Sequence, residues 1–336
     1  MKYSIIKILV GTIIILSTFS CSQDNTKGTI GYLYPSKNRV RFLKEGNYMI
    51  EKLEELGYKT TMVDAEDNDA LQIERGLEMI KQGLDLMVIA PVNGNTIAPV
   101  VREANNKGIP VIAYNRLINN VDYDMFFTGD NKDNGRIFCE AALKHSPTGN
   151  YVILAGDRFD RNGVELKQAI DTILAPKIND GSIRILYESY IESWNKQNAK
   201  FELEQVIQSY GTDIDAVIAC SDPMAQGTIE VLEKYDLAGK VFVCGQDALL
   251  QSVKYIYEGL QNITIYHPHK VLGNTVAELA DKILTGKKPE ELANAKTFNG
   301  RSDIPTLQVK SVAVTKDNIE EELIATGEYT RGEIKN

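Results

Sequence analysis

Six short polar segments of the 336-residue chain each follow an apolar run of strand length. They are Asn115-Arg116, Asp130-Asn131, 157–162, Ser221-Asp222, Gln246-Asp247 and His267. Carboxylate and amide oxygens accept hydrogen bonds and guanidinium groups donate them, so these side chains suit a ligand rich in polar groups. A single Asp or Ser in such a place often caps the following helix instead. Six in series, drawn from both halves of the chain, predict a polar pocket closed from two sides.

The segments that would position these residues alternate between strand-like and helix-like patterns. Strands are expected at 29–34, 59–63, 84–90, 109–114, 125–129, 151–155, 183–189, 216–220, 241–244 and 263–266. Helices are expected at 40–56, 67–83, 95–107, 164–173, 195–210, 223–235 and 249–260. Such alternation is typical of right-handed βαβ units and parallel sheets with helices on both faces. Because ten strands are many for one open sheet, an α/β fold with two domains is predicted, with a short connection near 130–133 and a cleft between the domains.

The N-terminus has the layout of an export signal. Lys2 and Lys7 supply positive charge before an apolar run at 8–16, and this run is too short to cross a bilayer. Cys21 stands at the expected cleavage point, as in bacterial lipoproteins, where the thiol is acylated. A signal peptide over 1–20, cleavage before Cys21 and a lipid anchor outside the cytoplasm are therefore predicted. The alternative is an ordinary secretory signal with Cys21 incidental.

Composition limits the partners and the redox chemistry. The formal net charge is −9, or −11 without residues 1–20, so nucleic acid and anionic membrane surfaces are poor partners. Lipidation of Cys21 would leave Cys139, Cys220 and Cys244, and an odd number argues against a disulfide framework. Cys220 and Cys244 each end an apolar run. Burial as small hydrophobic residues is favoured for them, with a disulfide between them as the alternative.

Several longer motifs, taken in order and spacing, resemble the periplasmic sugar-binding proteins of ABC transporters, and within that family its D-xylose-binding branch. The resemblance runs from about Thr29 to Tyr329. The motifs are VRF at 40–42, APVNGNTIAPVV at 90–101, GIPVIAYNRLI at 108–118, GDNKDNG at 129–135, GNYVILAG at 149–156, IDAVIACSD at 214–222, VCGQDA at 243–248 and NGRSDIP at 299–305.

The resemblance implies two Rossmann-like (βα) lobes joined by three hinge crossings, with the ligand in the interdomain cleft. The N-terminal lobe would hold 28–130 plus 267–303, and the C-terminal lobe 132–264 plus 304–330. The implied function is capture of a monosaccharide, D-xylose or a similar sugar, for an ABC transporter permease by a monomeric protein without cofactor. A sugar receptor for a membrane histidine kinase or chemoreceptor is the alternative partner arrangement.

The family's sugar-binding positions carry over residue by residue. The residue types match at Arg41, Arg116, Asp160, Asn162, Trp194 and Asp247, and Trp194, the only tryptophan, would stack on the apolar face of a sugar ring. Four implied sugar contacts depart from the pattern: Phe42 replaces tryptophan, Asn115 replaces aspartate, Ser221 replaces asparagine and His267 replaces lysine. His267 would donate to a sugar oxygen and make binding modestly pH-dependent, or would instead cap the following helix.

The sequence lacks the motifs that other functions would require. The segment GYLYPSKN after the first strand has one glycine, short of a dinucleotide-binding fingerprint, and no G-x-S-x-G elbow occurs. His267 and His269 form an i, i+2 pair without a third metal ligand nearby. A sugar-responsive repressor would begin with a DNA-binding helix pair and would present a basic face, whereas this chain begins with an export signal. Catalysis, a bound metal and DNA binding are not expected.

Overall fold

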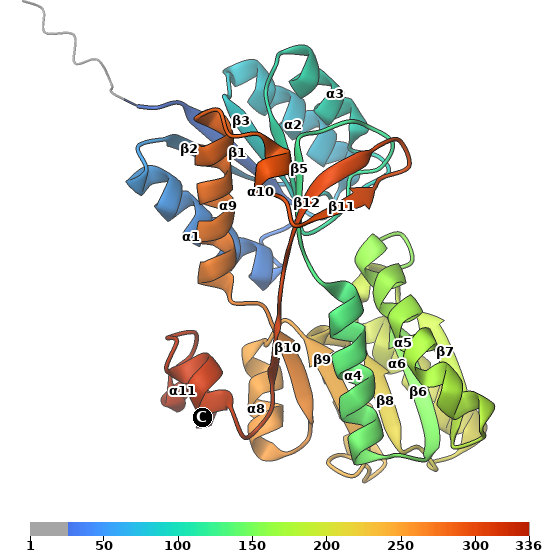
Figure 1. Ribbon diagram of the computed structural model, residues 1–336. Helices are drawn as coiled ribbons and strands as arrows, with labels where there is room; N and C mark the ends of the chain where they lie inside the picture. Colours follow the sequence, from blue (N-terminus) through green and yellow to red (C-terminus); the bar gives the residue numbers. More distant parts are fainter. Residues whose placement is uncertain (1–25, 336) are drawn as a thin grey trace, which may run out of the picture.

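The computed structural model describes residues 26–335, which fold into two α/β lobes joined by three chain crossings (Figure 1). The predicted fold class, with its two mostly parallel sheets, is confirmed. The predicted signal peptide 1–20 and Cys21 lie outside the described residues. Within 26–335, no helix has both the length and the apolar character needed to span a membrane.

The N-terminal lobe is built on a seven-stranded sheet of order β11-β12-β5-β4-β3-β1-β2. Its strands are β1 (Thr29–Tyr34), β2 (Lys59–Asp64), β3 (Leu86–Ile89), β4 (Val111–Tyr114), β5 (Met125–Gly129), β11 (Ala295–Phe298) and β12 (Asp303–Val309). All neighbours are parallel except β11, which runs antiparallel to β12. Successive side chains of a strand point to opposite faces, so Val88 packs into one core and its neighbours Met87 and Ile89 into another. The sheet is therefore buried on both faces.

The C-terminal lobe is built on a six-stranded sheet of order β13-β10-β9-β8-β6-β7. Its strands are β6 (Gly149–Ala155), β7 (Ile183–Tyr190), β8 (Ala216–Ala219), β9 (Phe242–Gln246), β10 (Ile263–Tyr266) and β13 (Val312–Val314). Here only β13 is antiparallel to its neighbour. Cys139, Cys220 and Cys244 are free and buried in this lobe's main core, as the burial interpretation predicted.

Helices cover the sheets of both lobes (Figure 1). The N-terminal lobe has α1 (Val40–Glu55), α2 (Asp69–Gln82), α3 (Ala98–Asn106), α9 (His269–Leu284) and α10 (Pro289–Leu292). The C-terminal lobe has α4 (Asn131–His145), α5 (Arg161–Asn179), α6 (Lys196–Tyr210), α7 (Asp222–Lys234), α8 (Leu250–Glu258) and α11 (Arg331–Lys335), with a 3₁₀ turn at Glu192–Trp194 and a π-helical turn at Glu320–Ile324. Most ends of the predicted elements agree to within a few residues, but the periodicity did not predict α4, nor the elements after β10, which are α9, α10, β11, β12, β13 and α11.

The three crossings follow β5, β10 and β12, which places the hinge segments at 129–131, 266–269 and 309–312. The third crossing lies later than the predicted boundary at 303–304. The reason is that β12 pairs in parallel with β5 in the first sheet, through Thr306 opposite Phe126. The chain therefore stays in the N-terminal lobe until Val309 and enters the second sheet only at β13.

Candidate functional site

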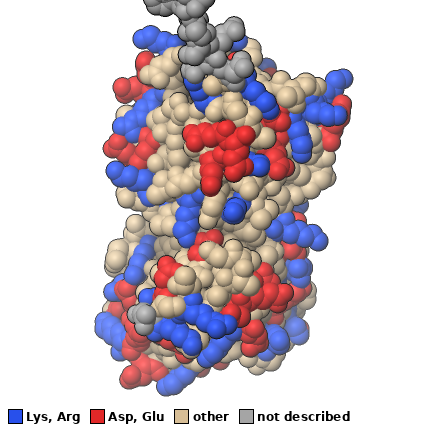
Figure 2. Space-filling view, turned by 90° about the vertical axis from the view of Figure 1, so that its left-hand side faces the viewer, with Lys and Arg blue, Asp and Glu red and all other residues tan. Residues whose placement is uncertain are grey.

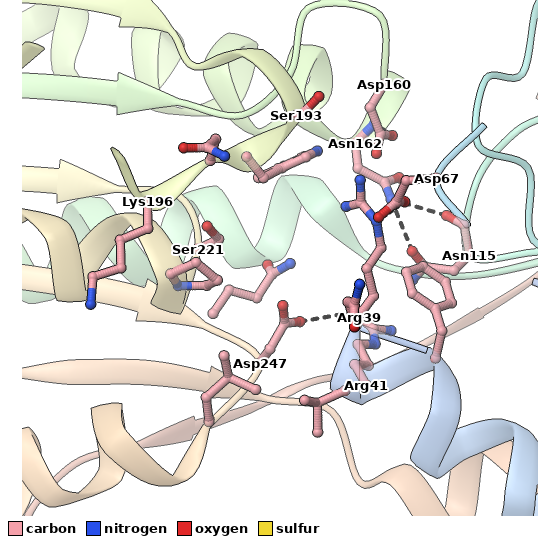
Figure 3. Close-up of a pocket in the computed structure, with 18 of the residues that line it drawn as sticks. Arg39, Arg41, Asp67, Asn115, Asp160, Asn162, Ser193, Lys196, Ser221 and Asp247 are labelled. Carbon is pink, nitrogen blue, oxygen red and sulfur yellow. Dashed lines mark hydrogen bonds and ion pairs between the residues drawn. The ribbon is translucent and has the colours of Figure 1, made fainter. Parts of the chain in front are cut away.

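A cavity of about 380 Å³ lies between the lobes and is lined by residues of both (Figure 3). Nine of the ten predicted ligand residues line it: Arg41, Phe42, Asn115, Arg116, Asp160, Asn162, Trp194, Ser221 and Asp247. Figure 3 shows Asp160, Asn162, Ser221 and Asp247 on the C-terminal side, opposite Arg39 and Arg41. The carboxyl ends of parallel strands meet at this edge of each sheet, which is why residues distant in sequence converge here.

Arg41 enters the cavity from the first turn of α1 and is held by carboxylates of both lobes. The i, i+4 spacing places its Nε 2.8 Å from Glu45, and its Nη1 lies 3.2 Å from Asp247 across the cleft. Tyr114 donates its hydroxyl to the other oxygen of Glu45. Burial works to lower the pKa of Arg41, but Glu45 and Asp247 outweigh it and raise the pKa. The guanidinium is therefore a permanently charged donor fixed in direction.

Arg116 follows β4 and is equally well fixed. Its Nε lies 2.9 Å from Asp160 of the other lobe, and its Nη1 donates to the carbonyl oxygens of Pro91 and Val92 at 3.1 and 3.2 Å. Its guanidinium carbon lies 5.5 Å from the centre of the Phe42 ring. Burial lowers the pKa of Arg116 from its usual value, while Asp160 acts to raise it. Two arginine–carboxylate pairs thus bridge the lobes beside the cavity.

Some of the strand-end residues cap the following helix, as the alternative predicted, and others line the cavity. Asp130 caps α4 through the backbone N–H of Asp133 and does not line the cavity. Asp160 both caps α5 and pairs with Arg116. Ser221 occupies the cap position of α7, yet its hydroxyl is buried without a hydrogen-bond partner among the described residues. A buried hydroxyl without a partner is costly unless a ligand or water supplies one, so Ser221 is placed to contact a ligand.

Trp194 stands on a tight loop of the C-terminal lobe. Ser193 and Trp194 both have positive φ, 56° and 55°, a backbone conformation that non-glycine residues rarely adopt. The indole lies against Gly156, where a Cβ would come within 2.1 Å of the ring, so only glycine leaves room for it. The indole Nε1 has no hydrogen-bond partner within 26–335. The ring therefore presents both an aromatic face and a free donor.

Strained backbone also occurs at other cavity residues. Asn115 has φ 62° and Asp247 has φ 100°. The Asn162 amide donates to the backbone oxygen and to Oδ1 of Asn115 at 3.0 and 3.2 Å, which links the lobes. Asn131 in turn donates to Asn162 Oδ1 at 2.9 Å. Strain of this kind persists where surrounding contacts hold it, and it gathers at ligand sites.

The structure does not bring His267 to the cavity. The residue lies in the second crossing and is buried, with Nδ1 hydrogen-bonded to Ser311 Oγ of the third crossing at 3.0 Å. It does not cap α9 either, because the cap position is taken by Pro268 without a side-chain bond. Burial, then the charge of Arg41 and then His269, lower the pKa of His267 well below its usual value. His267 belongs to the hinge.

Several lining residues were not predicted as ligand contacts. Asp67 follows the carboxyl end of β2, so the strand-end rule could have found it. Arg39 directly precedes α1 and Lys196 is the first residue of α6, and neither carries such a signal. These basic residues are paired as well: Arg39 with Asp67, and Lys196 with Glu230. Every arginine and lysine that lines the cavity thus has a carboxylate partner. The cavity suits an uncharged ligand with several hydroxyl groups and an apolar face.

The described residues contain no group of three or more His, Cys, Asp or Glu side chains placed to hold a metal ion. His269 Nδ1 instead contacts Glu328 at 3.1 Å. Burial raises the pKa of the Cys220 thiol to about 12, so that group is not an activated nucleophile.

Known proteins that resemble almost the whole chain in sequence or structure are also binding proteins. Residues 30–288 match the family described as "Periplasmic binding protein domain". The chain is 32% identical over 334 residues to the D-xylose-binding periplasmic protein of Escherichia coli, covering 99% of this chain and all of that one. It is 29% identical to the multiple sugar-binding periplasmic receptor ChvE of Rhizobium radiobacter, over 92% of this chain and 93% of that one. A solved ABC transporter solute-binding protein of Clostridium phytofermentans with bound β-D-glucose superimposes with a TM-score of 0.84 at 27% identity, covering 91% and 99% of the two chains.

Proposed function

Since the chain belongs to the periplasmic binding protein family, we propose that it is an extracytoplasmic receptor that captures a monosaccharide between its lobes and delivers it to an ABC transporter permease. D-xylose is the first candidate, because the D-xylose-binding protein of Escherichia coli matches over its whole length. The family binds solutes and does not transform them, which agrees with a site of fixed donors and acceptors.

The observation that carries the proposal is the distribution of hydrogen-bonding groups around the cavity. Arg41 and Arg116 are fixed donors, Asp160 and Asp247 are acceptors, and Ser221 and Trp194 hold polar atoms without partners among the described residues. A sugar hydroxyl both donates and accepts, so one ring can satisfy all of these groups. The Trp194 face and the Phe42 ring suit the C–H face of the same ring. A ligand lacking a matched hydroxyl would leave a buried group unpaired, at a cost of roughly 1–3 kcal/mol.

A thermal-shift screen of common monosaccharides tests the ligand class. Ligand that binds only the folded state stabilises it by about 2.7 kcal/mol at a hundredfold excess over Kd. We expect D-xylose, or another pentose or hexose, to raise the melting temperature, and small-angle scattering to show compaction on binding as the lobes close. The absence of a shift with every monosaccharide would refute sugar binding.

We propose further that residues 1–20 are removed and that Cys21 carries a lipid, so that the monomeric receptor is tethered to a membrane. The support is the signal layout and the thiol at the cleavage point. Wild type should enter the detergent phase on Triton X-114 separation, whereas Cys21→Ser should stay aqueous or unprocessed. Equal partitioning of the two forms would contradict the anchor.

A further inference from the structure

A second cavity, of about 340 Å³ and called the outer cavity, adjoins the first on the side of Phe159. Six residues line both cavities: Arg39, Asp67, Arg116, Asp160, Ser193 and Trp194. Beyond this shared boundary the outer cavity is lined by both lobes, with Asn93 on the N-terminal side and Phe159 on the C-terminal side. A ligand held in the inner cavity could therefore extend past Trp194 into the outer one.

Phe159 gives the outer cavity an aromatic wall. It is 65% exposed and belongs to no core cluster. Its loop is nevertheless fixed, because Asp157 accepts the backbone N–H of Phe159 at 2.7 Å with one oxygen and that of Ser193 at 2.6 Å with the other. The same carboxylate thus ties the Phe159 loop to the Trp194 loop. The two aromatic side chains stand in succession from the inner cavity to the outer one.

The charges of the outer cavity restrict what it can accept. Five carboxylates line it, against two arginines, and the arginines are already paired with Asp67 and Asp160. An anionic group would meet net negative charge there, whereas hydroxyl groups can donate to the carboxylates. On the face that Figure 2 shows, both lobes carry acidic and basic side chains, and acidic side chains also gather in a patch on the upper lobe.

We propose that the outer cavity is a subsite for a second sugar ring, so that the receptor also takes neutral disaccharides, with one ring in the inner cavity and the next against Phe159. This rests on the proposed monosaccharide function of the inner cavity. The inner ring keeps the contacts with Arg41, Trp194 and Asp247. The outer ring gains the Phe159 face and hydroxyl contacts to the carboxylates.

The test compares each monosaccharide with its β-1,4-linked dimer by calorimetry: D-xylose with xylobiose, and D-glucose with cellobiose. Phe159→Ala should weaken the disaccharide of the recognised sugar roughly fivefold or more, as expected for loss of an aromatic contact, and change the monosaccharide less than about twofold. Phe201→Ala is the matched control, because Phe201 is 63% exposed on α6 of the same lobe and lines neither cavity. It should leave both affinities unchanged.

The outcomes separate the two proposals. If wild type binds the monosaccharide but not its dimer, or if Phe159→Ala weakens both equally, the outer subsite is refuted and the proposed function stands. If wild type binds none of the four sugars and no monosaccharide in the thermal screen, the proposed function fails and the subsite fails with it. Binding of the dimer with a selective loss in Phe159→Ala supports the subsite.

Discussion

The two lobes contribute different kinds of side chain to the cavity. The N-terminal lobe contributes the arginines, Arg39, Arg41 and Arg116, and the C-terminal lobe contributes Asp160, Asp247 and the Trp194 plate. Arg41 and Arg116 have only 9% of their side chains exposed and are anchored by partners within their own lobe. Trp194 and Asp247 instead stand on loops of positive φ.

This difference indicates that cavity residues of the N-terminal lobe contribute to stability as well as to the site, whereas those of the C-terminal lobe contribute mainly to the site. On the N-terminal side, Arg41 and Arg116 also neutralise the little-exposed carboxylates of Glu45 and Asp160, so removing either arginine should destabilise the protein. On the C-terminal side, Trp194 and Asp247 line the cavity from loops of positive φ, so we expect them to contribute less to stability. The ion pairs of Arg41 with Asp247 and of Arg116 with Asp160 join the two kinds of wall. Variants of these residues, measured for stability and for sugar binding, test this difference between the lobes.

The largest expected effect on stability is that of Arg41→Ala. It leaves the Glu45 carboxylate, which is 0% exposed, with the Tyr114 hydroxyl as its one remaining hydrogen-bond donor among residues 26–335. Breaking a buried pair by removing one partner costs about 3–5 kcal/mol. Urea unfolding should show that loss, while Arg39→Ala, whose partner Asp67 has a side chain 37% exposed, should lose less than about 1 kcal/mol. Equal losses of unfolding free energy in the two variants would contradict the stabilising role of the buried Arg41–Glu45 pair.

Asp247→Ala should separate binding from stability. Loss of a charged hydrogen-bond acceptor should weaken sugar binding by roughly tenfold to a hundredfold, as for other hydrogen bonds to charged groups. Arg41 keeps Glu45, so the melting temperature of the empty protein should barely change. Asp236→Ala is the control for the backbone, because Asp236 also has positive φ, 57°, and does not line the cavity. Unfolding of Asp247→Ala alone would give that residue a structural role.

Trp194→Ala tests the aromatic plate in the same way. The indole packs on Gly156 at the edge of the C-terminal core, and its loss should remove most sugar binding. Thermal unfolding of the empty protein should stay nearly unchanged, as measured by calorimetry. If the variant melts much earlier than wild type, the ring serves the core more than the ligand.

A smaller effect is expected where the C-terminal tail joins the other lobe. Glu328 contacts Lys44 of α1 at 2.6 Å and His269 of α9 at 3.1 Å. Burial acts to raise the pKa of Glu328, but His269 and Lys44 outweigh it and lower the pKa to about 2. Because the folded pKa lies below the usual value near 4.5, this contact stabilises the protein above pH 4.5 and is lost as the pH falls toward 2.

Glu328→Gln should therefore cost about 2 kcal/mol of unfolding free energy at pH 7, and the difference from wild type should shrink between pH 4.5 and 3. Urea unfolding at each pH measures it. Glu333→Gln is the control in the same tail, since the Glu333 carboxylate accepts hydrogen bonds from Thr330 of that tail. A difference that is constant with pH would mean that the charge of Glu328 does not join the lobes.

Much of this arrangement could be predicted from sequence, because a parallel strand ends in a loop at a known edge of its sheet. That rule pointed to Asn115, Ser221 and Asp247 from periodicity alone. It could not find the crossings, since β12 at Asp303–Val309 returns to the first sheet through pairing with a strand far away in the chain. It also missed α4, whose first residues, Asn131 to Arg136, are mostly polar. Two of them, Asn131 and Asn134, are buried and donate to Asn162 and Gln246.

His267 carries the smallest expected effect on binding, and it shows where pattern alone misleads. It follows a strand, as several cavity-lining residues do, but β10 leads into a hinge, where the side chain meets Ser311 and lies near Arg41. Its lowered pKa keeps the folded imidazole neutral, so Kd for the recognised sugar should be flat from pH 5.5 to 8, contrary to the pH dependence expected for a ligand contact. Stability should respond instead: the unfolded chain takes up a proton near pH ~6.5, so folding free energy is lost as the pH falls below that value. His267→Gln should flatten that loss and leave Kd within about twofold, whereas the exposed His145→Gln should change neither. A sugar affinity that varies with pH in wild type and not in His267→Gln would return this residue to the binding site.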